Sequence, residues 1–465
     1  MALVPLPGSQ LTGLPAEIEA AIPPAVNDLL ATIREAGHAA HVVGGSLRDV
    51  VLGRSPADWD LASEALPEEI VGLFPDAVYE NQFGTVAVRR GGEHFEITTF
   101  RTDHDYADFR RPHRVEFGDS IEADLARRDF TVNAMAWGGR PGEEPALVDP
   151  YGGALDARAR ILRAVGDPST RFREDALRMI RAVRLATTLD FEIDPETLAG
   201  ITAHAELVGH LSGERIAAEL DKLLAAPMPS VGLRLLSETG LLEHLSPELA
   251  SEQGVPQNKV PGEDLWDHTL RSVDAAPANR PAVRLAALVH DIGKPATFAD
   301  GHFLGHDTVG AELAAALLDR LHVPRAVHAR VVGLVRLHMF SYEPNWSDAA
   351  VRRFIAKLQT LGDGFIEDLL TLRAADNVGS GLPADAGRLD ELRARIATEL
   401  AADAVLDRSG LVVDGDDLMT ELGVEQGPRL GRILDALVDR VIVDPTANDR
   451  PTLLLLAQAM LTEDR

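Results

Sequence analysis

Two adjacent glycines at the start of an expected helix indicate a place where the chain can bind an anion. Gly44 and Gly45 follow a short apolar strand predicted over 41–43, and they let the backbone approach a ligand closely because they lack side chains. Ser46 is suited to cap a helix expected over 46–52, whose first N–H groups would face the same place. Such a turn favours a phosphate group, although a Gly-Gly turn alone is more often only a structural corner.

Three carboxylates are expected beside this turn. Asp58 and Asp60 stand two residues apart on a strand predicted to follow the helix, so their side chains point to one face. Thr85–Arg89 and His94–Phe100 are predicted to pair as a hairpin, which makes Glu96 a third candidate. Carboxylate oxygens suit Mg²⁺, and paired magnesium ions serve in the transfer of phosphoryl or nucleotidyl groups. The pattern therefore predicts nucleotide transfer at this sheet.

A second polar segment, residues 124–136, combines guanidinium groups with an acid and an amide. The forks of Arg127 and Arg128 match the oxygens of a triphosphate. The carboxylate of Asp129 can accept hydrogen bonds from ribose hydroxyls, and Asn133 adds a supporting polar contact. The alternative interpretation is a salt-bridged junction between a strand and a helix.

A helix expected over 173–189 carries side chains that could distinguish bases. Asp175 and Arg178 are three residues apart and would share a helix face. One presents acceptors and the other donors, so together they can imitate the edge of a complementary base. Arg181 and Arg184 continue nearly the same face toward the phosphates. An ordinary ion pair at this spacing is the alternative interpretation.

Composition limits the class of protein. The chain has 465 residues, no cysteine and a formal net charge of −28. Without cysteine there are no disulfides and no thiolate metal sites. The start of the sequence lacks a signal-peptide pattern, and no apolar run approaches the roughly 18–20 residues of a membrane span, so we expect a cytoplasmic protein and no membrane partner. The acidic charge argues against nucleic-acid binding over the whole surface, but arginines outnumber acids between residues 158 and 184, where RNA contact is therefore expected.

The elements that must position these residues change in type along the chain. Strand signals nearly vanish after about Ala159, and helical spacing follows. A polar stretch with Pro256 and Pro261 marks a boundary between helical regions. The expected fold class is α+β, with a loose lead-in, a mixed head, a helical neck, a further helical domain and a helical C-terminal region over 1–24, 25–157, 158–250, 251–400 and 401–465, respectively.

The order of the motifs resembles a known family. The arrangement is similar to the nucleotidyltransferase core of the DNA polymerase beta superfamily, and specifically to bacterial CCA-adding tRNA nucleotidyltransferases and their poly(A) polymerase relatives. The resemblance covers about residues 38–245 and includes, in family order, Gly44–Asp49 with Asp58–Asp60, Arg127–Asn133, Glu174–Arg178 and Leu211–Leu220. It implies a polymerase-beta-like head followed by an all-helical neck.

The resemblance also implies roles for individual residues. Asp58 and Asp60 would hold the cofactor Mg²⁺, with Glu96 as a third catalytic carboxylate. Asp175 and Arg178 would select cytosine or adenine without a nucleic-acid template. The partners would be CTP, ATP and the 3′ end of tRNA. Nucleotide contacts are implied at Gly44, Gly45, Arg48, Arg127, Arg128, Asp129, Asn133, Asp175, Arg178, Arg181 and Arg184.

A second group of metal-ligand residues follows on later predicted helices. His, His-Asp and Asp on successive helices resemble the HD phosphohydrolase domain, in which imidazoles and carboxylates hold one or two divalent ions that activate water against a phosphoester. By that resemblance, a second divalent metal would be bound by His268, His290, Asp291 and Asp376. His306 and His338 belong to the same constellation. The domain is expected to be either a phosphohydrolase or mainly a tRNA-contacting body.

Two alternatives to CCA addition stay open. The motifs are shared with poly(A) polymerases and with enzymes that add only CC or only A, and the segment Tyr106–His113 matches the family's flexible loop imperfectly. The alternative of another class is an HD-type metal-dependent phosphohydrolase whose head only holds RNA. The sequence does not indicate the oligomeric state of the protein.

Overall fold

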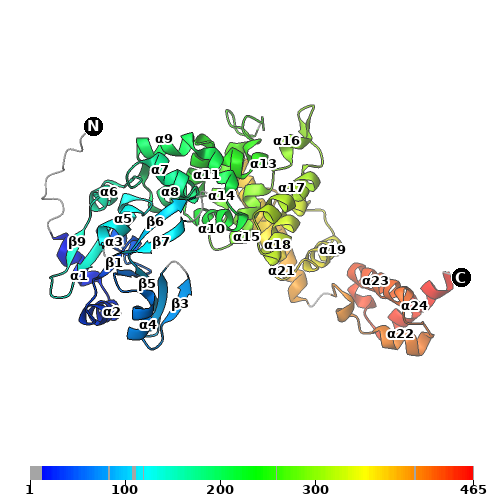
Figure 1. Ribbon diagram of the computed structural model, residues 1–465. Coiled ribbons are helices and arrows are strands. Elements are labelled where there is room, and N and C mark those ends of the chain that lie inside the picture. The colour runs from blue at the N-terminus through cyan, green and yellow to red at the C-terminus, as the bar shows by residue number, and fades with distance from the viewer. Residues whose placement is uncertain are drawn as a thin grey trace. The chain divides into compact units, whose positions relative to one another are not determined.

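The computed structural model describes residues 13–81, 84–106, 112–118, 120–257, 259–402 and 405–463 (Figure 1). The chain divides into two compact units, Met1–Pro247 and Glu248–Arg465. The tip of the expected flexible loop, residues 107–111, lies outside the described residues. Among the described helices, none combines the length and the apolar character needed to cross a membrane.

A mixed sheet forms the head of the first unit. Its seven strands lie in the order β3 (Val78–Asn81), β4 (Thr85–Arg90), β5 (Glu93–Thr99), β2 (Asp60–Ser63), β1 (Ala40–Val43), β8 (Ala136–Gly139) and β9 (Ala146–Val148). The β2–β5 pair is parallel and the other neighbouring pairs are antiparallel. The predicted hairpin is therefore present as β4 and β5, with its turn at Gly91 and Gly92. A separate hairpin joins β6 (Arg101–Tyr106) and β7 (Pro112–Phe117).

One face of this sheet is closed by apolar helices. Residues Ala40 and Val42 of β1 pack there with side chains from α1 (Leu14–Ala21), α2 (Pro24–Glu35), α3 (Gly45–Val51) and α4 (Pro67–Leu73), and Figure 1 shows α2 and α4 in blue beside the strands. Since side chains alternate along a strand, Val43 and Ala62 face the other side, which is where the polar residues gather.

The N-terminal stretch differs from the expectation. A loose lead-in is predicted over 1–24, but the structure has helix α1 within it. Leu14 and Ile18 are fully buried in the core of the head. Residues four apart lie on one face of a helix, so even this short helix makes a continuous apolar contact. The helix is too short to show a clear apolar periodicity in the sequence.

The rest of the first unit is mainly helical, as predicted. Its elements are α5 (Ile121–Ala126), η2 (Thr131–Asn133), α6 (Gly153–Ala159), β10 (Ile161–Leu162), α7 (Pro168–Glu174), α8 (Leu177–Leu189), β11 (Glu192–Ile193), α9 (Pro195–Ala203), η3 (Ala205–His210), α10 (Gly213–Leu224), α11 (Pro229–Glu238) and α12 (Leu241–Leu245).

The helix expected over 173–189 is interrupted. Asp175 has extended backbone angles, φ −145° and ψ 105°, so α7 ends before it and α8 begins at Leu177. The Asp175 carboxylate accepts a hydrogen bond from the Leu177 N–H at 3.0 Å, which satisfies a free donor at the start of α8. The expectation that Asp175 and Arg178 share one face of a continuous helix is therefore wrong.

The second unit is almost entirely helical. Two buried apolar clusters lie in it, one around Ile355, Leu370 and Leu392, and one around Leu437 and Leu453. Its elements are α13 (Pro247–Ala250), α14 (Leu265–Ala275), α15 (Pro281–Val289), α16 (Lys294–Thr297), β12 (Phe298–Ala299), β13 (His302–Phe303), α17 (His306–Arg320), α18 (Arg325–Leu337), α19 (Asp348–Gln359), α20 (Phe365–Gly379), α21 (Leu389–Ala401), η4 (Arg408–Gly410), α22 (Gly415–Leu422), α23 (Pro428–Val443), η5 (Pro445–Ala447) and α24 (Arg450–Glu463).

Candidate nucleotidyl-transfer site and metal centre

The glycine turn after β1 brings the backbone against an arginine and an acid. Gly44 has φ +82°, a conformation that favours glycine. A Cβ placed there would lie 3.1 Å from Arg128 Nη1 and 4.0 Å from Asp60 Oδ2. The helix begins one residue earlier than expected, at Gly45, and Ser46 Oγ donates to the Val43 carbonyl at 3.3 Å. The prediction that Ser46 caps this helix is therefore wrong.

The candidate catalytic carboxylates lie on the open face of the sheet. Asp60 begins β2 opposite Val43, whereas Asp58 lies two residues before the strand, so the prediction that both carboxylates stand on one strand is wrong. Leu61 pairs with Ile97, and by alternation Glu96 faces the same side as Asp60. Removal of water and the neighbouring Asp58 charge raise the pKa of Asp60, while Arg128 opposes them. A divalent cation would relieve this crowding of negative charge.

A single carboxylate holds the two triphosphate-binding candidates. Asp124, near the end of α5, accepts hydrogen bonds from Arg127 Nη2 at 2.7 Å and from Arg128 Nη2 at 3.1 Å. Burial alone would raise the pKa of Asp124, but the two guanidinium charges outweigh it and lower that pKa. Asp124 is 1% exposed, whereas both arginine side chains reach the surface. Its spacing from the arginines, three and four residues, is the sequence signal that indicates this contact.

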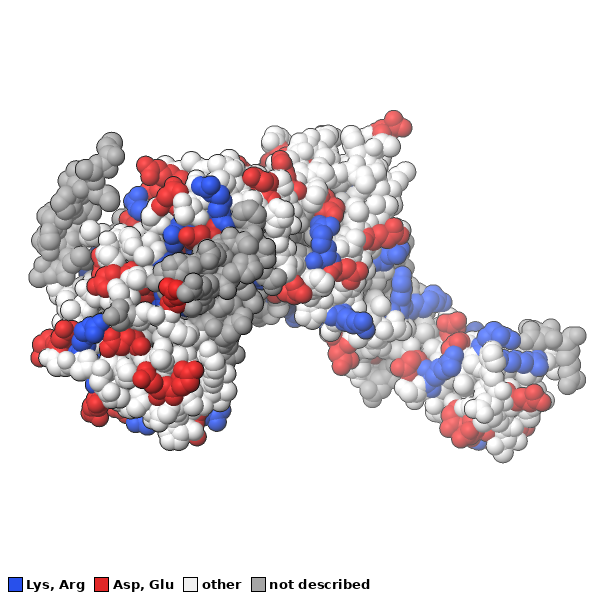
Figure 2. Space-filling view, in the orientation of Figure 1, with Lys and Arg blue, Asp and Glu red and all other residues white. Residues whose placement is uncertain are grey.

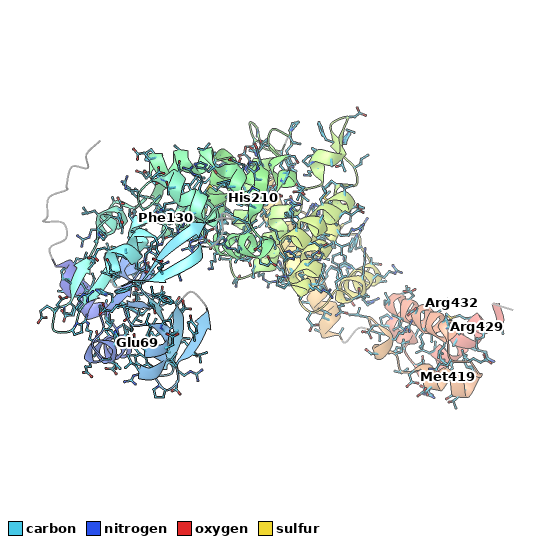
Figure 3. All side chains as sticks on the ribbon, in the orientation of Figure 1. Glu69, Phe130, His210, Met419, Arg429 and Arg432 are labelled. Atoms are coloured by element: carbon cyan, nitrogen blue, oxygen red, sulfur yellow. The ribbon has the colours of Figure 1, made fainter. Side chains whose placement is uncertain are left out.

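A chain of hydrogen bonds links the glycine turn to helix α8. Arg48 Nη1 donates to Asn133 Oδ1 at 2.8 Å, and Asn133 Nδ2 donates to Asp129 Oδ1 at 3.3 Å. Arg181 Nη2 lies 2.8 Å from Asp129 Oδ2. The next residue, Phe130, is fully buried and labelled in Figure 3, and its N–H donates to Asp129 Oδ1. The expected ribose contact of Asp129 stays a prediction, because this carboxylate already has protein partners.

The two candidate base-selecting residues have different partners. Arg178 donates from Nη1 to Glu174 Oε2 at 2.6 Å and from Nη2 to the Arg127 carbonyl at 2.8 Å. Asp175 Oδ2 accepts a hydrogen bond from Arg215 Nη2 at 2.8 Å. Sequence reasoning missed these roles of Glu174 and Arg215.

Arg184, also expected at the nucleotide, pairs with Glu219 of α10 at 2.5 Å. No side-chain hydrogen bond or ion pair between Arg184 and another of the nucleotide-binding candidates is seen in the described part of the chain.

Unused donors around these residues suit an anionic ligand. Buried guanidinium nitrogens without a hydrogen-bond partner in the described part of the chain include Nε of Arg128, Arg171 and Arg181 and Nη1 of Arg215. Buried polar groups are normally paired, so unpaired cationic donors suit the binding of negative charge.

The arginines expected to contact RNA are partly neutralised. Arg160 pairs with Asp190 at 2.7 Å, and Arg163 pairs with Asp194 at 2.5 Å. On the face that Figure 2 shows, acidic and basic side chains are interspersed over the described surface. On this face the excess of arginine in the sequence does not form one basic patch.

The later histidines and aspartates meet inside the second unit. They form two groups whose ligand atoms lie within 4.8 Å of one another, namely His268, His290 and Asp376, and Asp291, His306 and His338. Asp291 lies between the groups, because its Oδ2 is 3.1 Å from His268 Nε2 and its Oδ1 is 3.4 Å from His306 Nε2. All six residues are buried, so the predicted constellation is one compact cluster.

The imidazoles of this cluster are oriented for metal binding. The Nδ1 atoms of His290, His306 and His338 lie 2.7–2.8 Å from backbone carbonyls three residues earlier, so Nδ1 carries the hydrogen and Nε2 faces the centre. His268 Nε2 and His290 Nε2 are only 3.1 Å apart. Both nitrogens also lie 3.1–3.2 Å from Asp291 Oδ2, so either a proton on one of them or a shared metal ion can satisfy this contact. Asp291 and the other acids raise the pKa of His290 to about 10 against the effect of burial.

A cavity of about 530 Å³ adjoins the cluster. Asp291, His306 and Asp376 line it together with the cationic side chains of Lys259, Lys294 and Arg373. Cations beside a metal-type cluster suit a phosphate ester.

Comparison with known proteins connects both sites to one family. Three family models match: "Poly A polymerase head domain" over residues 40–163, "Probable RNA and SrmB-binding site of polymerase A" over 190–253, and "HD domain" over 262–380. A CCA-adding enzyme of Streptococcus thermophilus is 34% identical over 452 residues, which are 97% of this chain and 99% of that protein. The chain belongs to the CCA-adding enzyme family.

Other members of the CCA-adding enzyme family agree with this assignment. The enzyme of Levilactobacillus brevis is 35% identical over 96% of this chain and 98% of its own. The crystal structure of the Bacillus stearothermophilus CCA-adding enzyme in complex with CTP is 29% identical, with a TM-score of 0.70 over 95% of this chain and 99% of that one. The predicted α+β architecture with a polymerase-type head and an HD domain is confirmed. The roles of individual residues stay predictions.

Proposed function

We propose that this protein adds or repairs the 3′-terminal CCA of tRNA in the cytoplasm, using CTP and ATP and releasing pyrophosphate. Its full-length relatives are CCA-adding enzymes. The observation that carries the proposal is that Gly44, Arg128 and Asp60 meet at the open face of the sheet. A Cβ at Gly44 would lie 3.1 Å from Arg128 Nη1 and 4.0 Å from Asp60 Oδ2. We assign catalysis to residues 25–157, base selection and RNA contact to 158–250, the HD domain to 251–400 and a helical tail to 401–465.

In the proposed reaction, the 3′-hydroxyl oxygen of the RNA attacks the α-phosphorus of the nucleotide, and the bond to the β-phosphate oxygen breaks. Pyrophosphate leaves with the electron pair, and the hydroxyl proton passes to a base. Asp58 and Asp60 would hold Mg²⁺, which stabilises charge on the phosphates when bound. Glu96 faces the same side and can orient or deprotonate the attacking hydroxyl. Arg127 and Arg128, held by Asp124, would bind the triphosphate.

Base selection is proposed to rest on Asp175 and Arg178. Both lie at the α7–α8 junction, although not on one continuous helix. Arg178 is fixed by Glu174, so its donors have a defined direction. Gly44, Gly45, Arg48, Asp129, Asn133, Arg181 and Arg184 complete the proposed nucleotide contacts. Arg178→Ala should therefore reduce the preference for CTP and ATP more than it reduces triphosphate affinity.

Product length distinguishes the proposed reaction from its relatives. The protein is incubated with tRNA that ends before CCA, with CTP and ATP separately and together. Three added nucleotides followed by a stop support CCA addition. An unlimited A tail shows poly(A) synthesis, and an arrest after CC, or addition of A to a CC end only, shows a partial enzyme. Asp60→Ala should abolish incorporation while the fold and RNA binding are kept, and turnover by the folded variant would contradict its role.

The buried cluster supports a second activity, metal-dependent hydrolysis of phosphoesters. The close approach of His268 Nε2 and His290 Nε2 favours this activity, because one metal ion could bind both nitrogens. The candidate ligands are His268, His290, Asp291 and Asp376, joined by His306 and His338. The test is hydrolysis of cyclic phosphates and phosphomonoesters with added divalent metals. Hydrolysis that is lost in His290→Ala supports the activity, and metal binding without hydrolysis limits the cluster to a structural centre.

A further inference from the structure

Helix α10 holds two functional side chains of the preceding helical region. Arg215 and Glu219 are four residues apart on α10, so they share a face. Arg215 Nη2 donates to Asp175 Oδ2 at 2.8 Å, and Glu219 Oε2 accepts from Arg184 Nε at 2.5 Å. Glu219 is 5% exposed, so this contact is shielded from solvent.

Asp175 depends on Arg215 for its side-chain direction. Its backbone is extended, so no helix fixes the carboxylate. One oxygen accepts from the Leu177 N–H, and the other accepts from Arg215. Without Arg215 the carboxylate could rotate about its side-chain bonds and still keep the bond to Leu177. A base edge can be read only if the acceptors stay at fixed positions.

Arg215 also has an unused donor. Its Nη1 is buried and has no hydrogen-bond partner in the part of the chain that the structure describes. The side chain is partly exposed, as is that of Asp175. The guanidinium therefore donates to Asp175 through Nη2, and it leaves the Nη1 donor unused.

We propose that Arg215 is a positioning residue for base selection, which sets the direction of the Asp175 carboxylate against the edge of the incoming base. The inference rests on the proposed function, since it needs nucleotide transfer to tRNA. In this proposal α10 not only packs against neighbouring helices but also orients a side chain that reads the base. A purely structural Arg215 would affect all four nucleotides equally, whereas a positioning Arg215 changes their ratio.

The test compares kcat/KM for CTP, ATP, UTP and GTP on tRNA that ends before CCA or after CC. In Arg215→Gln the preference for CTP over UTP and for ATP over GTP should fall about tenfold or more, as expected for the loss of one charge-assisted hydrogen bond. Arg215→Lys should recover part of this preference, because it restores the charge without the fork. If Arg215→Gln does not fold, the nucleotide preference of Arg215→Lys is measured in its place.

Two further variants separate positioning from helix packing. Glu219→Gln weakens the contact of Glu219 with Arg184 of α8 and should keep the ratios among nucleotides. Asp175→Asn should lose selectivity, and the addition of Arg215→Gln to it should cause little further loss. Unchanged ratios in Arg215→Gln, or equal losses for all nucleotides in Arg215→Gln and Glu219→Gln, would overturn the inference. If the unaltered protein adds no nucleotides, the proposed function itself fails.

Discussion

Arg48 and Asn133 are 85 residues apart in the chain and are joined by a hydrogen bond of 2.8 Å from Arg48 Nη1 to Asn133 Oδ1. The other end of the same amide donates to Asp129. A carboxamide offers an acceptor and donors at once, so Asn133 can serve an arginine and an aspartate together. This bond fixes Arg48 beside the glycine turn, at the place where the triphosphate is proposed to bind.

Replacing Asn133 should weaken nucleotide binding without changing base choice. In Asn133→Ala, Arg48 loses its acceptor and Asp129 loses a donor. We expect KM for CTP and for ATP to rise together, by about tenfold, as for the loss of one hydrogen bond to a charged group. Steady-state incorporation into tRNA measures both constants. Exposed Arg90→Ala serves as the control, and a change in the CTP-to-UTP ratio of Asn133→Ala would contradict the assignment.

Glu174 should be needed for selectivity and for stability. Its Oε2 accepts from Arg178, and its Oε1 lies 3.0 Å from Arg171 Nη2. Glu174→Gln leaves one carbonyl for two guanidinium groups, so one of them loses its partner. We expect a loss of about 1–3 kcal/mol in unfolding free energy, measured by urea denaturation. Discrimination against UTP should fall in the same variant. Full selectivity in a folded Glu174→Gln protein would show that the Arg127 and Arg171 carbonyls are enough to position Arg178.

Contacts between residues close in the sequence were easier to predict than contacts between residues far apart in it. The glycine turn and the acids after it were predicted because spacing within one strand–helix–strand unit decides which residues meet. The Asp175–Arg178 pair was predicted on the wrong geometry, because the extended backbone of Asp175 interrupts the expected helix. The Asp175–Arg215 contact spans 40 residues, and no local pattern indicates it.

Longer-range assembly was predictable only through residue type. Helical spacing alone could not bring His268 to His290, or His306 to His338. What indicated the cluster was the resemblance of His, His-Asp and Asp on successive helices to the HD phosphohydrolase domain, in which imidazoles and carboxylates bind metal. The exact partners of Asp291 follow from tertiary packing.

The cluster should bind two metal ions with Asp291 between them. After loading with Mn²⁺ or Ni²⁺ and desalting, elemental analysis should find about two ions per chain, one for each ligand group. His338→Ala should retain about one ion, and Asp291→Asn should retain almost none because its oxygens face both groups. Exposed His244→Ala, which lies in the first unit, is the matched control. If the unaltered protein binds only one ion, and His338→Ala still binds it, the metal site is limited to His268, His290, Asp291 and Asp376.

His41 should make the head sensitive to mild acid. It is 4% exposed on β1, and burial lowers its pKa to about 4, with Arg34 adding to the effect. In the unfolded chain a histidine takes up a proton below about pH 6.5. The folded state does not, so the contribution of His41 to stability is complete above pH 6.5 and is lost as the pH falls toward 4. From pH 7 to pH 5 the loss should be about 2 kcal/mol. Urea unfolding of the first unit should show this loss in the unaltered protein and in a control with exposed His244→Gln, but not in His41→Gln, which cannot ionise. An equal pH dependence in all three proteins would mean that His41 is protonated in the folded state.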